Sequence, residues 1–422
     1  MSQAVKCLIL LAIVALLFIT ELIPLAVTAM GGAVACGLLG FIPAKAVFSG
    51  LSDSTVVLFA GMFVVGASMF YTGLAQKIGT AVVRFCGTGE MSLVFGLMLV
   101  ATLLSSVLSN TGTAACLMPV ALGICAAARI PASRQLMPLA FACGWGGVIT
   151  MVGTPPNIIA TGALKAAGLP TFSFFEFAWI GIPLSLAGML YMMFIGKYLL
   201  PKVELDANQN IEQEIEAKTT STSKQMISGL ILLLVVVTMA IGIPGVTLEM
   251  AAVIGAIVCV LTGCLTEKQA YGSIDWVTIF LFAGMMPIAT SMDKTGAGAL
   301  IADWTVGLMG GTPSPLVVTA VLFALSCTLT QFMSNTASAA LLCPIGLAIA
   351  KQLGADPKAV VMAIAVAASC AFATPVGTPP NTLVLGPGNY KFVDYVKAGV
   401  PLVIVSFIVS IIVIPMVWPF FP

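Results

Sequence analysis

The chain has 422 residues, of which 60% are hydrophobic and only 8% are charged, and its mean hydropathy is +1.13. Soluble globular proteins carry about 25% charged residues, so this composition excludes a water-soluble fold and predicts a protein that crosses the lipid bilayer many times. The net charge of +1 and the lack of any basic run exclude nucleic acid as a partner.

The sequence lacks the usual ligands of a metal centre. It contains no His, and its 11 Cys are scattered through apolar segments without a Cys-x-x-Cys pair. We therefore expect the cysteines to be small buried side chains, and we expect no zinc site, redox site or organic cofactor.

Apolar segments follow one another along almost the whole chain, and many approach the ~20 residues that a bilayer span needs. They fall at 5–20, 24–42, 54–75, 91–108, 112–128, 136–152, 175–199, 226–243, 247–264, 273–292, 315–333, 337–350, 358–376 and 399–420. The first could pass for a signal peptide, but its counterpart in the second half favours a retained span. One long polar stretch, at 201–224, has the composition of a linker between two halves.

The two halves share four landmarks in the same order. "LFAGM" occurs at 58–62 and 281–285, "SMxxTG" at 68–73 and 291–296, "SNT" at 109–111 and 334–336, and "GTPPN" at 153–157 and 377–381. Their offsets are 223, 223, 225 and 224 residues. This constancy indicates an internal duplication, as in many transporters.

The number of apolar runs predicts that the second repeat is inverted. Whether the pair of runs around each SNT crosses twice or folds back as a re-entrant hairpin, each half crosses the membrane an odd number of times. With the N-terminus outside and each SNT pair a hairpin, eleven of the 17 Lys and Arg fall on the cytoplasmic side. The positive-inside rule favours this orientation and a cytoplasmic linker, in an inner (plasma) membrane protein.

The SNT tripeptides are polar groups deep in apolar sequence. A Ser/Asn/Thr group followed by small residues is good N-cap chemistry, so a tip there would point the positive end of a helix dipole into the membrane centre. Its hydroxyl and amide oxygens could also face a small cation. A single occurrence would fit a tight loop between spans equally well, but two at matched offsets favour a binding site.

The GTPPN segments offer complementary chemistry. Two consecutive prolines remove two N–H donors and interrupt a helix, which leaves carbonyl groups that a membrane tolerates only where they are buried or line a site. Unwound carbonyls beside Ser, Thr and Asn oxygens commonly hold Na⁺ in transporters with broken helices. Each half therefore offers an anion-attracting helix end and a cation-attracting oxygen cluster.

Two short segments look like interfacial amphipathic helices that link a static unit to a moving one: 77–89, which carries Lys and Arg, and its match at 298–310. Asp275, Asp293 and Asp303 lie near span ends, where we expect them to be solvated.

These motifs resemble the divalent anion/Na⁺ symporter family, which carries dicarboxylates, tricarboxylates and sulfate, over nearly the whole chain. The paired SNT and GTPPN stretches and "TELIPLAVTAM" at 20–30 carry the resemblance. It implies a homodimeric all-α polytopic membrane protein, an inverted-repeat transporter with two re-entrant helical hairpins, two broken helices, a scaffold and an elevator-type transport domain. The implied segments are scaffold at 1–76 and 225–293, interfacial helices at 77–90 and 294–314, the linker at 201–224, and transport units at 91–200 and 315–422, with hairpins at 91–128 and 315–350 and broken helices around 153–157 and 377–381.

The resemblance also implies the site residues. Those that would hold the substrate carboxylates are Ser109, Asn110, Thr111, Ser334, Asn335, Thr336, Thr378 and Pro379. The first Na⁺ site would use Ser105, Asn110 and backbone near Gly153, and the second would use Thr330, Asn335 and backbone near Met333 and Gly377.

The function that follows is secondary active transport of small C4 dicarboxylates such as succinate, fumarate or malate, driven by Na⁺. A Na⁺-independent dicarboxylate exchanger and a carrier of sulfate or another inorganic oxyanion remain open alternatives. A channel is disfavoured by broken helices in an inverted repeat. An enzyme is disfavoured because the sequence offers no nucleophile–base pair, metal cluster or nucleotide-binding loop.

Overall fold

The computed structural model describes residues 2–86, 89–201, 221–308 and 313–421, and all regular structure in these ranges is helical. The first half contains α1 (Gln3–Thr20), α2 (Leu25–Leu38), η1 (Ala44–Ala46), η2 (Ser49–Ser52), α3 (Ser54–Tyr71), α4 (Leu74–Cys86), α5 (Glu90–Ser105), α6 (Asn110–Ala128), η3 (Ala132–Arg134), α7 (Leu136–Gly147), α8 (Pro155–Ala166), α9 (Ala178–Tyr191), η4 (Met192–Gly196) and α10 (Lys197–Leu199). The second half contains α11 (Thr222–Ile241), α12 (Leu248–Leu261), α13 (Glu267–Gly272), α14 (Trp276–Thr295), α15 (Ala297–Leu308), α16 (Pro315–Thr330), α17 (Asn335–Leu353), α18 (Pro357–Ala368), α19 (Pro379–Leu385) and α20 (Phe392–Val417).

The predicted fold class is confirmed. Seven helices in the described ranges are long and apolar enough to cross a membrane, and several shorter apolar helices accompany them. Each SNT lies between two contacting helices, α5 and α6 or α16 and α17, and each GTPPN lies where one helix ends and the next begins. Helix α4 overlaps the predicted interfacial segment at 77–90, and α15 lies within the one at 294–314. Most of the predicted linker lies outside the described residues.

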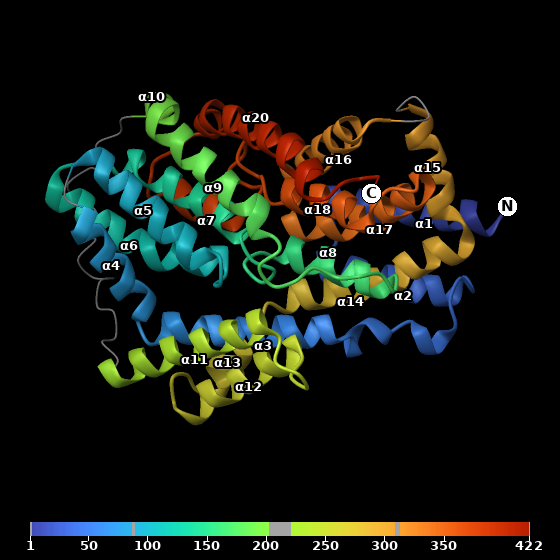
Figure 1. The fold of residues 1–422 in the computed structure, drawn as a ribbon, viewed down its shortest axis with the longest axis horizontal. Coiled ribbons are helices and arrows are strands. Elements are labelled where there is room, and N and C mark those ends of the chain that lie inside the picture. The colour runs from blue at the N-terminus through green and yellow to red at the C-terminus, as the bar shows by residue number, and fades with distance from the viewer. Residues whose placement is uncertain (1, 87–88, 202–220, 309–312, 422) are drawn as a thin grey trace.

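The two halves repeat the same order of helices and point in opposite directions. In Figure 1, α4, α5 and α6 lie toward one end of the long axis, whereas α15, α16 and α17 lie toward the other. With the short helices left aside, the second long helix of each repeat packs on the third long helix of the other, α2 on α14 and α12 on α3. Such reciprocal contacts are those of a two-fold axis, so the duplication has produced a pseudo-symmetric molecule.

The LFAGM repeat has its physical reason in these reciprocal contacts. A Cβ at Gly61 would lie 2.8 Å from Ala252, and a Cβ at Gly284 would lie 2.6 Å from the backbone of Ala29. Only glycine lets the two helices approach this closely, which is a common device for packing helices in membranes. The four helices α2, α14, α3 and α12 are thereby locked in two tight pairs.

The remaining helices interlock through a core behind the two tips. Helix α8 of the first repeat contacts α17 and α18, and α19 of the second repeat contacts α6 and α7. Phe372 packs edge-on against Phe141 and Trp145, and the indole of Trp145 donates a hydrogen bond to Thr102. This core fixes both tips against both interrupted helices.

Candidate functional site

Each SNT begins a helix as its sequence predicts. Ser109 is the N-cap of α6 and accepts a hydrogen bond from the Gly112 N–H at 3.1 Å, and Ser334 caps α17 in the same way through the Ala337 N–H at 3.1 Å. Both helices have 19 residues, so the positive ends of two long helix dipoles are presented at the tips.

The first tip closes a cage of oxygen atoms. The Ser105 hydroxyl lies 2.6 Å from Asn110 Oδ1 and donates to the carbonyl of Cys143 at 2.9 Å. The same end of the Asn110 amide lies 3.1 Å from the carbonyl oxygens of Cys143 and Gly153. Hydrogen bonding favours the orientation with the amide nitrogen inward, where it donates to the Ser105 hydroxyl and to both carbonyls. With the amide oxygen inward, the side chain instead adds a fourth oxygen, which would need a cation as its partner.

The second tip repeats this cage. The Thr330 hydroxyl lies 2.8 Å from Asn335 Oδ1 and donates to the carbonyl of Ala368 at 2.7 Å. The same end of the Asn335 amide lies 3.0 Å from the Gly377 carbonyl and 3.1 Å from that of Ala368. Thus the structure brings Ser105, Asn110 and Gly153 together, and likewise Thr330, Asn335 and Gly377.

Sequence reasoning missed two cage members, the carbonyls of Cys143 and Ala368, because neither residue lies in one of the shared motifs. Met333 lies just before the second tip, with its N–H bonded to the carbonyl of Leu329 and its side chain buried.

In each GTPPN segment, the side-chain amide of the final Asn holds the non-helical backbone in place. Thr154 and Thr378 are extended, at φ −144° and −150°, and the following prolines begin α8 and α19. The Asn157 amide donates to the carbonyl of Thr150 at 2.8 Å. The Asn381 amide donates to that of Thr374 at 2.9 Å. Carbonyls that lose their helical partners are therefore satisfied by a side chain.

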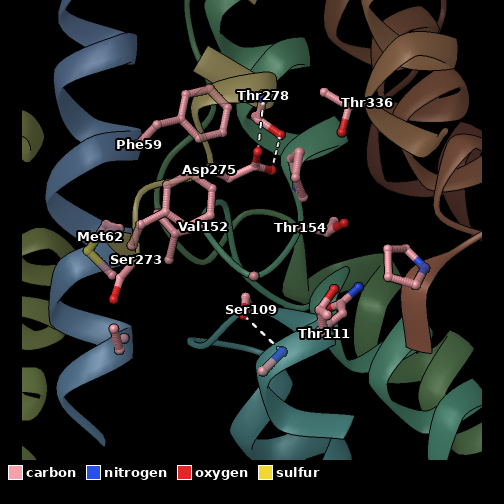
Figure 2. Close-up of a pocket in the computed structure, with 18 of the residues that line it drawn as sticks. Phe59, Met62, Ser109, Thr111, Val152, Thr154, Ser273, Asp275, Thr278 and Thr336 are labelled. Atoms are coloured by element: carbon pink, nitrogen blue, oxygen red, sulfur yellow. Dashed lines mark hydrogen bonds between the residues drawn. The ribbon is translucent and has the colours of Figure 1, made fainter. Parts of the chain in front are cut away.

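Both tips open into one cavity of about 630 Å³. Its lining includes all eight residues that the resemblance assigns to the substrate: Ser109, Asn110, Thr111, Ser334, Asn335, Thr336, Thr378 and Pro379. Figure 2 shows Ser109 and Thr111 of the first tip and Thr336 of the second around the same space. Ser105 and Thr330 are fully buried behind the tips. The cavity is large enough for a small organic anion.

The wall opposite the tips was not found from the sequence. It comes from α3, with Phe59, Met62 and Phe63, and from the start of α14, with Asp275 and Thr278. Thr154 also lines the cavity, its side chain is buried, and its hydroxyl has no hydrogen-bond partner in the described part of the chain. The only available signal was the repeat, because Thr154 is the counterpart of Thr378.

Two helix ends and two oxygen cages around one cavity, in an all-helical polytopic fold, define the class of protein as a membrane transporter. The profile of the citrate transporter (CitMHS) family matches residues 15–345 and 331–420, and the chain belongs to this family.

Relatives extend over nearly the whole chain. An uncharacterized transporter of Haemophilus influenzae is 32% identical, over 95% of this chain and 89% of its own length. YfbS, an uncharacterized transporter of Escherichia coli K12, is 27% identical, over 97% and 98%. A Staphylococcus aureus protein named sodium-dependent dicarboxylate transporter SdcS is 26% identical, over 95% and 84%. The resemblance to divalent anion/Na⁺ symporters is thereby confirmed.

Two solved structures share the fold. The Alcanivorax borkumensis YdaH transporter matches with a TM-score of 0.67 at 15% identity, over 96% of this chain and 98% of its own. Neisseria gonorrhoeae MtrF matches with a TM-score of 0.63 at 14% identity, over 90% and 82%. At these identities the likeness concerns the fold alone.

Proposed function

We propose that the protein is a secondary active transporter that moves small C4 dicarboxylates such as succinate, fumarate or malate together with Na⁺. The observation that carries the proposal is the meeting of both tips, each backed by its own oxygen cage, in a single cavity.

The chemistry of the cavity suits a doubly charged anion that travels with cations. The N-termini of α6 and α17 and the tip hydroxyls supply partial positive charge and hydrogen bonds for carboxylates. Among the described residues that line the cavity there is no Lys or Arg. Two Na⁺ ions, one in each cage, would therefore supply the full counter-charge of a dianion.

The named relatives support this assignment. SdcS is called a sodium-dependent dicarboxylate transporter, and its similarity covers 95% of this chain. The substrate residues are then the eight tip and Thr-Pro residues, and the cation ligands are the side chains and carbonyls of the two cages together with backbone near Met333.

Transport would proceed by an elevator motion in a homodimer of the inner (plasma) membrane. The tightly packed pairs α2 with α14 and α3 with α12 support a static scaffold at 1–76 and 225–293. The units at 91–200 and 315–422 would move against it, carried by the segments at 77–90 and 294–314, with the linker at 201–224 in the cytoplasm.

The test is uptake of radiolabelled succinate into proteoliposomes, with Na⁺ or K⁺ outside and with the lumen empty or preloaded with dicarboxylate. We expect uptake into empty vesicles that requires Na⁺. Absence of uptake under every condition, or uptake that unlabelled succinate fails to inhibit, would reject the proposal.

A Na⁺-independent dicarboxylate exchanger is the second candidate, and the two Asn side chains favour it. If Asn110 and Asn335 turn their nitrogens inward, they donate to the carbonyls of both cages, and no cation is needed to satisfy them. In the same assay an exchanger would ignore Na⁺ and require a preloaded lumen.

A further inference from the structure

We propose that Asp275 is a charge-selecting residue of the substrate cavity, which disfavours anions with more than two negative charges. The inference rests on the proposed function and refines its substrate class. It addresses a difference among the relatives, because the family is named for citrate, a tricarboxylate, whereas SdcS is named for dicarboxylates.

The position of Asp275 carries the proposal. The residue is the N-cap of α14, and it lines the cavity together with both tips. Figure 2 shows it between Phe59 on one side and Thr154 and Thr336 on the other. It is the only Asp or Glu among the described residues that line this cavity. A substrate held by the tips therefore faces one formal negative charge across the cavity.

The hydrogen bonds of Asp275 hold its carboxylate in place. One oxygen accepts from the Thr278 N–H at 3.2 Å, and the other accepts from the Thr278 hydroxyl at 2.5 Å. These two bonds fix the carboxylate as the N-cap of α14, on the lining of the cavity.

The charge balance gives the direction of the selectivity. A dianion with two Na⁺ leaves the occupied cavity with the single negative charge of Asp275. A trianion with the same two Na⁺ adds a second negative charge, which Asp275 repels in an environment with less screening than bulk water. A neutral residue at this position would remove that repulsion and preserve the helix cap.

Asp275→Asn is the direct test, because Asn caps helices as well as Asp does. The purified protein is titrated with succinate and with citrate at saturating Na⁺, at a pH where citrate is fully ionised, and binding is followed through thermal stabilisation. We expect the ratio of the citrate Kd to the succinate Kd to fall by about 3- to 10-fold in the variant. Initial uptake rates of both labelled acids in proteoliposomes should shift in the same direction.

Asp356→Asn is the matched control. Asp356 caps α18 through the N–H of Lys358 at 2.8 Å and lies outside the cavity lining, so its substitution should leave the ratio unchanged. Asp275→Ser provides a second neutral N-cap if the Asn variant does not fold.

The outcomes separate the inference from the proposed function. A wild-type protein that binds succinate, with an unchanged ratio in both Asp275 variants, overturns the inference alone. A wild-type protein that binds neither acid rejects the proposed function and the inference with it. An equal shift in Asp356→Asn would also overturn the inference, because the effect would then not come from the cavity.

Discussion

Asn110 and Asn335 each serve two environments at once. Each is the first residue of its helix and lines the cavity, while its amide reaches back into the oxygen cage behind the tip. Under the proposed function, a single side chain would thus couple the anion site to the cation site.

Replacing either Asn with Ala should therefore strongly reduce coupled uptake. The change removes an amide from the cavity and from the cage, and the loss of hydrogen bonds to charged partners predicts a fall of about 10- to 100-fold in succinate uptake. The measurement is Na⁺-dependent uptake by equal amounts of reconstituted protein. Wild-type flux in either variant would contradict the site.

Gly147 lies against the first cage, and a methyl group at this position would press on the atoms of the cage. A Cβ at Gly147 would lie 2.5 Å from Asn110 Oδ1 and 3.0 Å from the Gly153 carbonyl. We expect Gly147→Ala to raise the Na⁺ concentration for half-maximal uptake by about 10-fold or more, because a displaced ligand loses about 1.5–3 kcal/mol. Gly31→Ala, where a Cβ meets nothing within 4 Å, should leave it unchanged. Equal behaviour of the two variants would exclude the cage as a cation site.

Most of the site residues that the sequence predicts lie in motifs that recur in both halves. SNT and GTPPN recur at matched offsets, so their polar atoms were visible before the fold was known. Asp275 and Phe59 carry no such local mark, because they reach the tips only through the packing of α3 and α14. Asp275 was expected to be solvated, and it is exposed, but the space that it faces is the cavity between the tips.

At the scale of elements, Glu176 ties the loop between α8 and α9 to two segments of the other repeat. It accepts hydrogen bonds from Lys358 Nζ at 3.0 Å, from the Trp418 indole at 2.9 Å and from the Ser173 N–H at 2.9 Å. Burial raises the pKa of this carboxyl, but the bonds from Trp418, Ser173 and Lys358 outweigh it and hold the pKa below its usual value.

This lowered pKa predicts a pH-dependent contribution to stability. A carboxyl whose pKa is lower in the folded state stabilises the fold fully above its unfolded pKa, about 4.3, and loses that contribution as the pH falls through the folded value. Glu176→Gln should lower the free energy of unfolding by about 1–3 kcal/mol at pH 7. Its difference from the wild type should shrink below pH 4.

Thermal unfolding in detergent at several pH values checks this. Glu21→Gln is the control, because Glu21 is exposed at the end of α1 and its substitution should change the free energy of unfolding little. A constant difference between Glu176→Gln and the wild type from pH 7 to pH 3.5 would mean that packing, not charge, is lost.

At the scale of the whole molecule, a second cavity of about 680 Å³ lies between α8, α14, α15 and α17. Its α14 wall is the repeat counterpart of the α3 wall of the substrate cavity. Phe59, Met62, Phe63, Gly66, Ala67 and Phe70 line the first cavity, and Phe282, Met285, Met286, Ala289, Thr290 and Asp293 line the second. The inversion was predictable from the number of spans. The sequence did not show which of the two cavities both tips would line, because the two repeats carry the same motifs.

The two cavities differ in which part of the hairpin faces them. The first is lined by α6 from its first residue, whereas the second is lined by α17 only from Ala340 onward, five residues beyond Asn335. At about 1.5 Å per helical residue, these five residues span roughly 8 Å of α17. If the second hairpin took the position relative to α14 that the first now has relative to α3, the second tip would lie against the α14 wall.

In that opposite arrangement, we expect a contact between two residues that have no need to touch in the present one. A Cβ at Gly66 would lie 4.0 Å from the Cα of Leu108, within reach of a disulfide, and the repeat counterparts of this pair are Ala289 and Met333. If the transport unit slides, the double variant Gly66→Cys/Leu108→Cys should cross-link in the present arrangement, and Ala289→Cys/Met333→Cys should cross-link in the opposite one. Each bond should stop succinate uptake until a reductant is added.

Cross-linking is detected from the gel mobility of the protein. Cys116 and Cys343, which line the two cavities, are first replaced by Ala. Formation of the first bond but never the second would place this transporter outside the elevator mechanism.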